Sequence, residues 1–227
     1  MRFQEASPDA RAVVYAGIQA DPLVARAATL LADASLEERI LARAAMNGMS
    51  SDATVWRTMF PGLFGPGRQA GPERDRSEAI LEVAVAVAER GEQVRSQVRG
   101  AIVESLTETL VRRRASAAAG AAPAVRRERR ILFDGVRAEI HPYDVTVETP
   151  GATEAIDCKW GARGINADVL HQLDDARTHA ADEDESLVAS LVVFDARRSC
   201  DVRLARQTAP HESTRIVSLE TLDELAR

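Results

Sequence analysis

The chain has 227 residues, of which 45% are hydrophobic and 28% charged, a composition typical of folded domains and unlike that of disordered chains. No segment holds the roughly 20 consecutive apolar residues that a membrane helix needs, and the first ten residues lack the apolar core of a secretory signal. Two cysteines, Cys158 and Cys200, are too few for a disulfide framework or a four-cysteine zinc site. We therefore expect a soluble, cytoplasmic protein with no membrane partner.

The formal net charge of −6 is distributed unevenly along the chain. Residues 1–130 hold 19 Arg and 16 acidic residues, a net of +3, whereas residues 131–227 hold 10 basic and 19 acidic residues, a net of −9. Within the first part, residues 93–130 carry nine Arg against three Glu, a net of +6. A local basic segment can bind a polyanion even in an acidic protein, because binding follows patches and not the total charge.

The N-terminal part predicts successive helices. Asp21-Pro22 and the capping box Ser35-Leu36-Glu37-Glu38 begin two of them, and Asn47-Gly48 ends the second with a left-handed turn. The segment Ser50-Ser51-Asp52 caps a third, short helix, and a loop rich in Gly and Pro follows it. The predicted helices cover residues 23–33, 36–46, 53–60, 74–90 and 94–114, and the predicted loop covers residues 61–72.

After the low-complexity segment 115–124, which is either a linker or the frayed end of the preceding helix, the hydrophobic period changes from 3.6 to 2. We expect strands at 130–140, 143–148, 155–159, 187–194 and 202–206, and helices at 166–181 and 219–226. The predicted division is a helical domain over residues 1–92 and an α/β domain over residues 93–227. The first helix of the second domain is 94–114, which gives that domain the order αβββαβ.

Almost all basic residues of the chain are arginines: of the 29 basic residues, 28 are Arg and one is Lys, Lys159. In a chain where Arg serves almost everywhere, the one Lys is a candidate for a role that a guanidinium cannot fill. An ammonium is a compact point charge that fits beside a carboxylate, whereas a guanidinium is a broad planar fork.

Lys159 ends a predicted strand with the sequence Asp157-Cys158-Lys159, and Asp144 lies on the strand before it. Because side chains alternate along a strand, Asp157 and Lys159 share one side, and Asp144 can join them if the two strands form a hairpin. Two carboxylates with one ammonium suit the hydrolysis of a phosphodiester with Mg²⁺, since carboxylate oxygens bind that ion. The alternative is that both Asp residues form ordinary surface ion pairs.

These residues resemble a known signature. His141-Pro142-Tyr143-Asp144, twelve intervening residues and then Asp157-Cys158-Lys159 are similar to the PD-(D/E)XK motif of a nuclease superfamily that includes restriction endonucleases and repair nucleases. The resemblance covers roughly residues 98–206. It implies an α/β restriction-endonuclease-like core, a mixed sheet flanked by helices, preceded here by an all-α domain.

The resemblance also implies roles for individual residues. Asp144 and Asp157 would be metal ligands for Mg²⁺, with Mn²⁺ as a substitute, and Lys159 would position the attacking water. Glu104 matches the place of an additional acidic ligand, although Glu108 one turn later fits as well, and Gln172 matches a supporting glutamine. Arg163, which follows the motif, would contact nucleic acid.

Residues 36–60 predict a helix-turn-helix, and the segment LARAAMNGMSSDATVWRTMF is similar to the recognition segment of tetracycline-repressor-type DNA-binding domains. The resemblance implies that Thr54 and Arg57 contact DNA bases or phosphates. Asp52 departs from the pattern, because an acid there would approach phosphate. The alternative is an ordinary bundle of helices.

Together these features predict a Mg²⁺-dependent endonuclease of restriction or defence type that acts on DNA, with duplex DNA favoured and a homodimer expected. Two alternatives stay open at this stage. The chain could be a DNA-binding regulatory protein that keeps only the fold of a nuclease. It could also be a nuclease subunit that acts only with a partner protein bound to its acidic C-terminal half.

Overall fold

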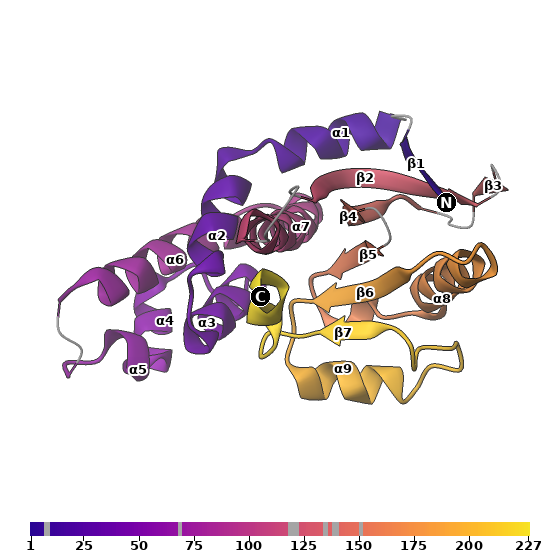
Figure 1. Cartoon of the computed structure of the whole chain (residues 1–227). Helices are drawn as coiled ribbons and strands as arrows, with labels where there is room; N and C mark the ends of the chain where they lie inside the picture. Colours follow the sequence, from indigo (N-terminus) through magenta and orange to yellow (C-terminus); the bar gives the residue numbers. More distant parts are fainter. Residues whose placement is uncertain (7–9, 68–69, 118–122, 134–135, 138–140, 150–151) are drawn as a thin grey trace. The chain divides into compact units, whose positions relative to one another are not determined.

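The computed structural model describes residues 1–227 except 7–9, 68–69, 118–122, 134–135, 138–140 and 150–151 (Figure 1). The chain divides into two compact units, which we describe separately. The helical unit is Ala10–Leu106, and the sheet unit combines Met1–Asp9 with Thr107–Arg227. The division differs from the predicted boundary after residue 92 in two ways. It falls inside one helix, and the first residues belong to the sheet unit because they pair with a strand of that unit.

The helical unit is built from short helices whose caps are the residues that the sequence indicates. Asp21 accepts a hydrogen bond from the Leu23 amide, Ser35 and Glu38 form the predicted capping box, and Asp52 caps the helix that follows it. The elements are α1 (Ala10–Gln19), α2 (Pro22–Ala32), α3 (Leu36–Met46), α4 (Ala53–Met59), α5 (Pro61–Phe64), α6 (Pro72–Ala88) and the N-terminal part of α7 (Glu92–Ala117).

The short helix α5 was not predicted. Residues 61–64 lie in the segment expected to be a loop, but Pro61 occupies the first helical position, where no amide hydrogen is needed. Within the described residues, none of the helices has the length and apolar character required to cross a membrane.

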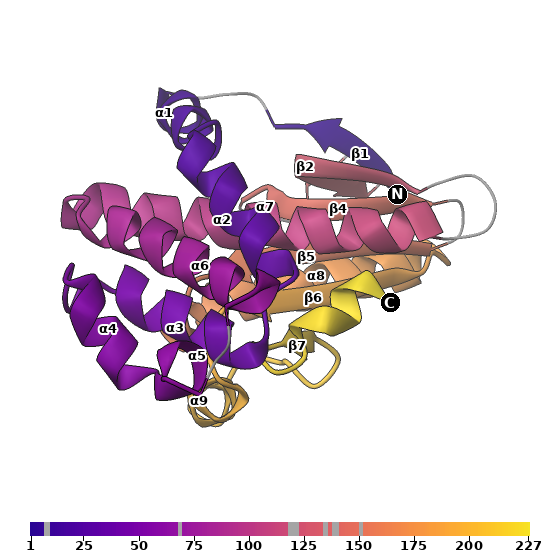
Figure 2. The same ribbon diagram turned by 90° about the vertical axis from the view of Figure 1, so that its left-hand side faces the viewer.

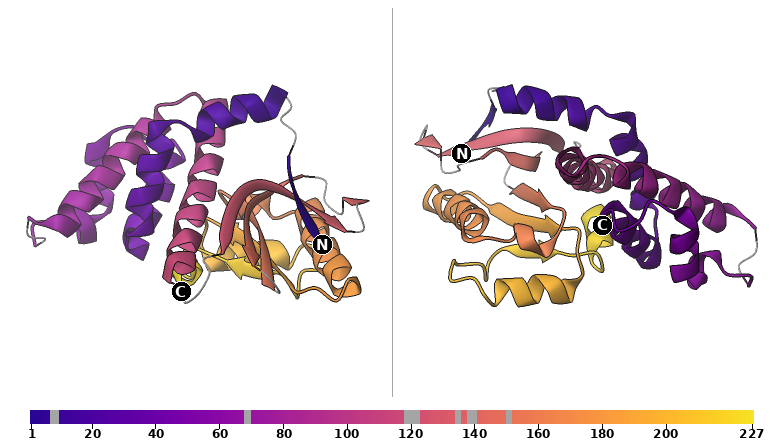
Figure 3. Two further views of the ribbon diagram at one scale, coloured as in Figure 1. Left: turned by 45° about the horizontal axis from the view of Figure 1, so that its top comes forward. Right: turned by 180° about the vertical axis from the view of Figure 1, so that it is seen from behind.

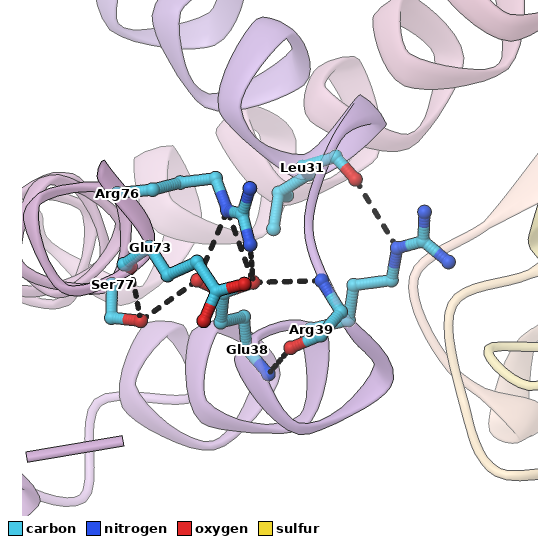
Figure 4. A network of polar contacts seen from close by, with 7 residues as sticks. Leu31, Glu38, Arg39, Glu73, Arg76 and Ser77 are labelled. Carbon is cyan, nitrogen blue, oxygen red and sulfur yellow. Dashed lines mark hydrogen bonds and ion pairs between the residues drawn. The ribbon is translucent and has the colours of Figure 1, made fainter. Parts of the chain in front are cut away.

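The capping box of α3 also joins this helix to α6 (Figure 4). The Glu38 side chain is buried, and its carboxylate accepts hydrogen bonds from the Ser35 amide at 2.7 Å, from Ser77 Oγ at 2.7 Å and from the Arg76 guanidinium at 3.0 Å. Burial alone would raise the pKa of Glu38, but these hydrogen bonds outweigh it, so the pKa lies below its ordinary value of 4.5. The charged carboxylate is therefore part of the packing between α3 and α6.

We predict that Glu38→Ala lowers the free energy of unfolding by about 2–4 kcal/mol, because it removes the acceptor of Arg76, one of the two acceptors of Ser77 and half of the capping box. Urea unfolding at pH 7 measures this loss. Glu37→Ala, an exposed change in the same helical turn, is the control and should cost less than about 1 kcal/mol.

The deficit of the Glu38 variant should also depend on pH. A carboxylate whose pKa is lowered by folding stabilises the native state above its unfolded pKa, and this contribution is lost as the pH falls through the native pKa. The difference between wild type and variant should therefore shrink below about pH 4.5. Equal stability of the two proteins at pH 7 would contradict the assignment.

Seven strands of the described residues form one mixed sheet in the order β1-β2-β4-β5-β6-β7, with β3 paired to β2 (Figure 1). Pairing is antiparallel from β1 through β5, and β6 and β7 then follow in parallel. The strands are β1 (Arg2–Glu5), β2 (Ala124–Phe133), β3 (Val136–Arg137), β4 (Tyr143–Thr149), β5 (Ala152–Lys159), β6 (Leu187–Val193) and β7 (Arg215–Val217). This arrangement confirms the predicted α/β class of fold.

Two helical segments cover opposite faces of this sheet. On one face α8 (Ala167–Asp182) buries Leu170 and Leu173 in a core that includes Ala155 of β5. On the other face Thr107, in the C-terminal part of α7, contacts Cys158 of β5, with 3.4 Å between the hydroxyl oxygen and the sulfur. Residues 155 and 158 are three positions apart on β5, so their side chains point to opposite faces of the sheet. Figures 2 and 3 show this part of α7 and α8 on either side of the strands.

Several boundaries differ from the prediction. β2 begins at Ala124, six residues earlier than expected, because its backbone pairs with β4 from Ala124 opposite Glu148 onward. Its arginines add ion pairs to neighbouring elements, Arg127 with Glu108 and Arg129 with Glu148. Strands β1 and β7 were not predicted. Residues 134–135 and 138–140 of the strand expected at 130–140 lie outside the described residues.

The C-terminal segment contains the clearest error. Residues 202–206 were expected to form a strand, but α9 (Arg197–Leu204) is a helix. Its buried residues, Cys200 and Leu204, are four positions apart, which is helical spacing, whereas Val202 is exposed. The last predicted helix, 219–226, is shorter than expected, because only η2 (Leu222–Ala226) is helical there, as a 3-10 helix that begins after Thr221. A second 3-10 helix, η1 (Ala162–Gly164), follows β5.

Candidate active site

The candidate site lies where β4 begins and β5 ends. The two strands pair in antiparallel register up to Val145 and Ile156. Beyond that pair, the amide of Cys158 donates to Oδ2 of Asp144 at 2.6 Å. The Asp144 carboxylate is therefore attached to the backbone between Asp157 and Lys159, so the structure brings the three residues of the sequence motif together.

Lys159 and Asp157 form an ion pair at the end of β5. Burial would lower the pKa of Lys159, but the charges of Asp157 and Asp144 outweigh it, and the pKa lies above its ordinary value. The ammonium is consequently protonated throughout the neutral range. Both acidic partners are the residues expected from the spacing of the motif.

The side chain of Lys159 is confined by the turn that follows β5. A Cβ atom placed on Gly164 would lie 2.9 Å from the Cβ, Cγ and Cδ atoms of Lys159, so the aliphatic part of the lysine lies directly against this glycine. The turn is itself fixed, because Oδ2 of Asp195, just after β6, accepts the Ala162 amide at 3.0 Å. The aliphatic part of Lys159 is therefore held in place by this turn, and its ammonium extends toward the carboxylates.

Sequence reasoning missed Glu128, whose carboxylate has an oxygen within 4.8 Å of an Asp144 oxygen. Its backbone has a φ of 52°, the left-handed region that non-glycine residues rarely adopt. Such conformations concentrate at functional sites because they cost about 1–3 kcal/mol. In sequence, Glu128 is hidden between two pairs of arginines, and no local pattern indicates a left-handed residue within a strand.

Gln172, predicted to support the site, contacts backbone in the structure. It lies on α8 and is buried. Its Nε2 donates to the carbonyl of His141 at 3.1 Å, and its Oε1 accepts the His141 amide at 3.3 Å. These two hydrogen bonds hold the segment that leads into β4, three residues before Asp144. Its contacts thus make Gln172 a positioning residue for β4, whereas a direct catalytic role stays a prediction.

Glu104 lies in the helical unit, on α7, and is buried. Within that unit its carboxylate accepts hydrogen bonds from the Tyr15 hydroxyl and from Gln19 Nε2. Its predicted role as a metal ligand stays a prediction.

The predicted helix-turn-helix corresponds to α3 and α4, which are joined by six residues. Oδ1 of Asp52 accepts the Thr54 amide at 2.8 Å, so the acid that departs from the DNA-binding pattern is the N-cap of α4. Arg57 forms an ion pair with Glu78 at 2.8 Å, which raises the pKa of the guanidinium. As the structure stands, the charge of Arg57 is offset within the protein.

Comparisons with known proteins bear on the fold alone. No protein-family model matches the sequence, and no curated protein matches it. Among solved structures, the crystal structure of protein VC1899 from Vibrio cholerae superposes with a TM-score of 0.50 and 14% sequence identity. The match covers 99% of this chain and 56% of that one, so the chain spans little more than half the length of that protein.

We predict that Glu128→Asn raises the free energy of unfolding by about 0.5–1 kcal/mol, because Asn tolerates the left-handed conformation better than Glu does. Urea unfolding of the two proteins measures the change. Glu128→Gln removes the charge but keeps the unfavourable backbone, so it separates charge repulsion from backbone strain. If the Asn variant is less stable than both the Gln variant and wild type, backbone strain at this position is excluded.

Proposed function

We propose that this protein is a metal-dependent nuclease that hydrolyses the phosphodiester bonds of DNA, with its active site at the junction of β4 and β5. The observation that carries the proposal is the hydrogen bond from the Cys158 amide to Asp144, which brings a second carboxylate to the ion pair of Asp157 and Lys159. Two acids and one ammonium in this grouping are costly to hold together unless they serve a purpose.

The order of elements supports this proposal. α7 is followed by the antiparallel strands β2, β4 and β5, then by α8 and by β6 parallel to β5. This is the αβββαβ order that the resemblance to PD-(D/E)XK nucleases implies. We propose a restriction-endonuclease-like core on that basis, with the motif residues on the second and third strands of the order.

The residues fit a hard divalent cation such as Mg²⁺ or Mn²⁺. Asp144 and Glu128 offer carboxylate oxygens within 4.8 Å of one another, and oxygen ligands of this kind are those that Mg²⁺ prefers. We assign these two as ligands, with Asp157 and Glu104 as the further ligands that the sequence motif implies. When bound, such an ion would supply positive charge that polarises a phosphoryl oxygen and acidifies a water molecule.

The protein's own groups would orient the attacking water, offset developing charge and position the acids. The Lys159 ammonium, protonated and directed by Asp157, can donate a hydrogen bond to the attacking water and offset charge that develops on the phosphate. The hydrogen bond from the Cys158 amide fixes the position of the Asp144 carboxylate at the end of β5. Gln172 keeps the start of β4 in place, so the two strands present their acids at a constant separation.

The basic segment 93–130 supports DNA binding less than its charge suggests. In the sheet unit, four of its arginines form ion pairs: Arg112 and Arg127 with Glu108, Arg114 with Glu154 and Arg129 with Glu148. Much of the +6 charge of this segment therefore serves to hold β2, β5 and α7 together.

The proposal is tested by incubating plasmid, linear duplex, single-stranded DNA and RNA with the protein in Mg²⁺, Mn²⁺ or EDTA. Wild type should cut in a metal-dependent manner, with duplex DNA the expected substrate, and Lys159→Ala should lower the rate by at least about 10²-fold, as removal of one charged transition-state donor typically does. Lys159→Arg should be impaired similarly, because a planar guanidinium cannot replace a compact ammonium between Asp157 and Gly164.

Arg215→Ala, which removes a half-buried cation paired with Glu224, is the matched control and should leave the rate unchanged. Circular dichroism establishes that each variant is folded. Metal-dependent cutting by Lys159→Ala at the wild-type rate would remove Lys159 from the site. No cutting by wild type on any of the substrates would contradict the proposed activity of the chain on its own.

A further inference from the structure

A groove beside the candidate active site has arginines on most of its lining. It has a volume of about 420 Å³ and lies between η1 and α9, both in the sheet unit. Its cationic residues are Arg163 from η1, Arg198 and Arg203 from α9, and Arg206 from the turn just after α9. Ser199 adds a hydroxyl group to the same surface. Guanidinium groups and a hydroxyl are donors, so the groove is suited to a ligand rich in acceptors.

This concentration of charge contrasts with the surrounding sequence. Residues 131–227 hold 19 acidic and only ten basic residues, and four of those ten line this one groove. Among the described residues, the side chains of Arg163, Arg198 and Arg206 have no hydrogen-bond or ion-pair partner, and all three are exposed. In contrast, Arg197, the neighbour of Arg198, pairs with Asp201 at 2.8 Å. The charge of the groove is therefore not offset locally.

The groove is structurally linked to Lys159. Arg163 belongs to the same turn as Gly164, against which the Lys159 side chain lies. Arg203 Nε donates to the carbonyl of Ile165 at 2.8 Å, which attaches α9 to the end of that turn. A ligand held by these arginines would thus be held at a fixed position relative to the lysine.

We propose that this groove binds the phosphodiester backbone of the nucleic acid, at phosphates next to the bond that Lys159 faces. Arginine suits this task because its fork donates two parallel hydrogen bonds to phosphate oxygens. Contacts to the backbone carry no sequence information, so the groove sets the position of the strand and not the choice of bases. This inference rests on the proposed nuclease function, and it assigns to the arginines of this groove the polyanion contact expected from segment 93–130.

The test is fluorescence anisotropy of labelled duplex DNA, single-stranded DNA and RNA with the wild-type protein in EDTA, where cleavage is blocked. Arg198→Ala combined with Arg206→Ala should raise Kd about 10–100-fold. The slope of log Kd against log salt should fall by about 2, since each phosphate contact contributes about 0.9 for duplex DNA and about 0.7 for single strands. Arg163→Ala alone should lower the slope by about 1.

The matched control is Arg197→Ala, which removes a cation from the same helix but outside the groove lining. Its Kd and salt slope should equal those of wild type. Wild-type Kd and slope in the double variant, with its fold established by circular dichroism, would overturn the inference. So would the absence of nucleic-acid binding by wild type in EDTA.

Cleavage in Mg²⁺ on the same samples separates this inference from the proposed function. If wild type cuts while the double variant binds and cuts as well as wild type, the groove inference fails and the nuclease stands. If wild type binds through the groove but never cuts, the groove inference stands and the nuclease activity of the chain alone fails.

Discussion

The candidate site depends on one hydrogen bond, from the amide of Cys158 to the carboxylate of Asp144. It forms where the β4–β5 ladder ends, and it attaches the acid at the start of one strand to the end of the other. An ionised acceptor makes such a bond stronger than a bond between neutral groups. Because the amide lies between Asp157 and Lys159, the same bond sets the spacing of the charged groups.

The charges of the site balance each other only in part. Lys159 is held between two acids, which keeps it protonated despite burial. On the acidic side, Asp144 also has Glu128 nearby, and two carboxylates at this separation repel one another unless a cation lies between them. The left-handed backbone of Glu128 adds to this cost. The arrangement is unfavourable for the folded protein alone and favourable for a protein that binds a divalent cation.

The sequence predicts those parts of the site that depend on local rules. Alternation along β5 places Asp157 and Lys159 together, and a hairpin brings Asp144 to them, so a short motif and strand periodicity are sufficient. The sequence does not predict the role of Glu128, because the left-handed φ of this residue is imposed by tertiary structure and the surrounding arginines give no sign of that conformation. The groove is not predicted either, because a strand is expected at 202–206, and on such a strand Arg203 and Arg206 would point to opposite faces.

The central claim, that Asp144 holds a metal ion beside Lys159, is tested most directly by calorimetric titration of Mn²⁺ into the purified protein without nucleic acid. The account predicts binding to wild type and binding to Asp144→Asn that is at least about tenfold weaker. Lys159→Ala should bind at least as tightly as wild type, because it removes a competing positive charge. Binding to Asp144→Asn with the wild-type affinity would contradict the account.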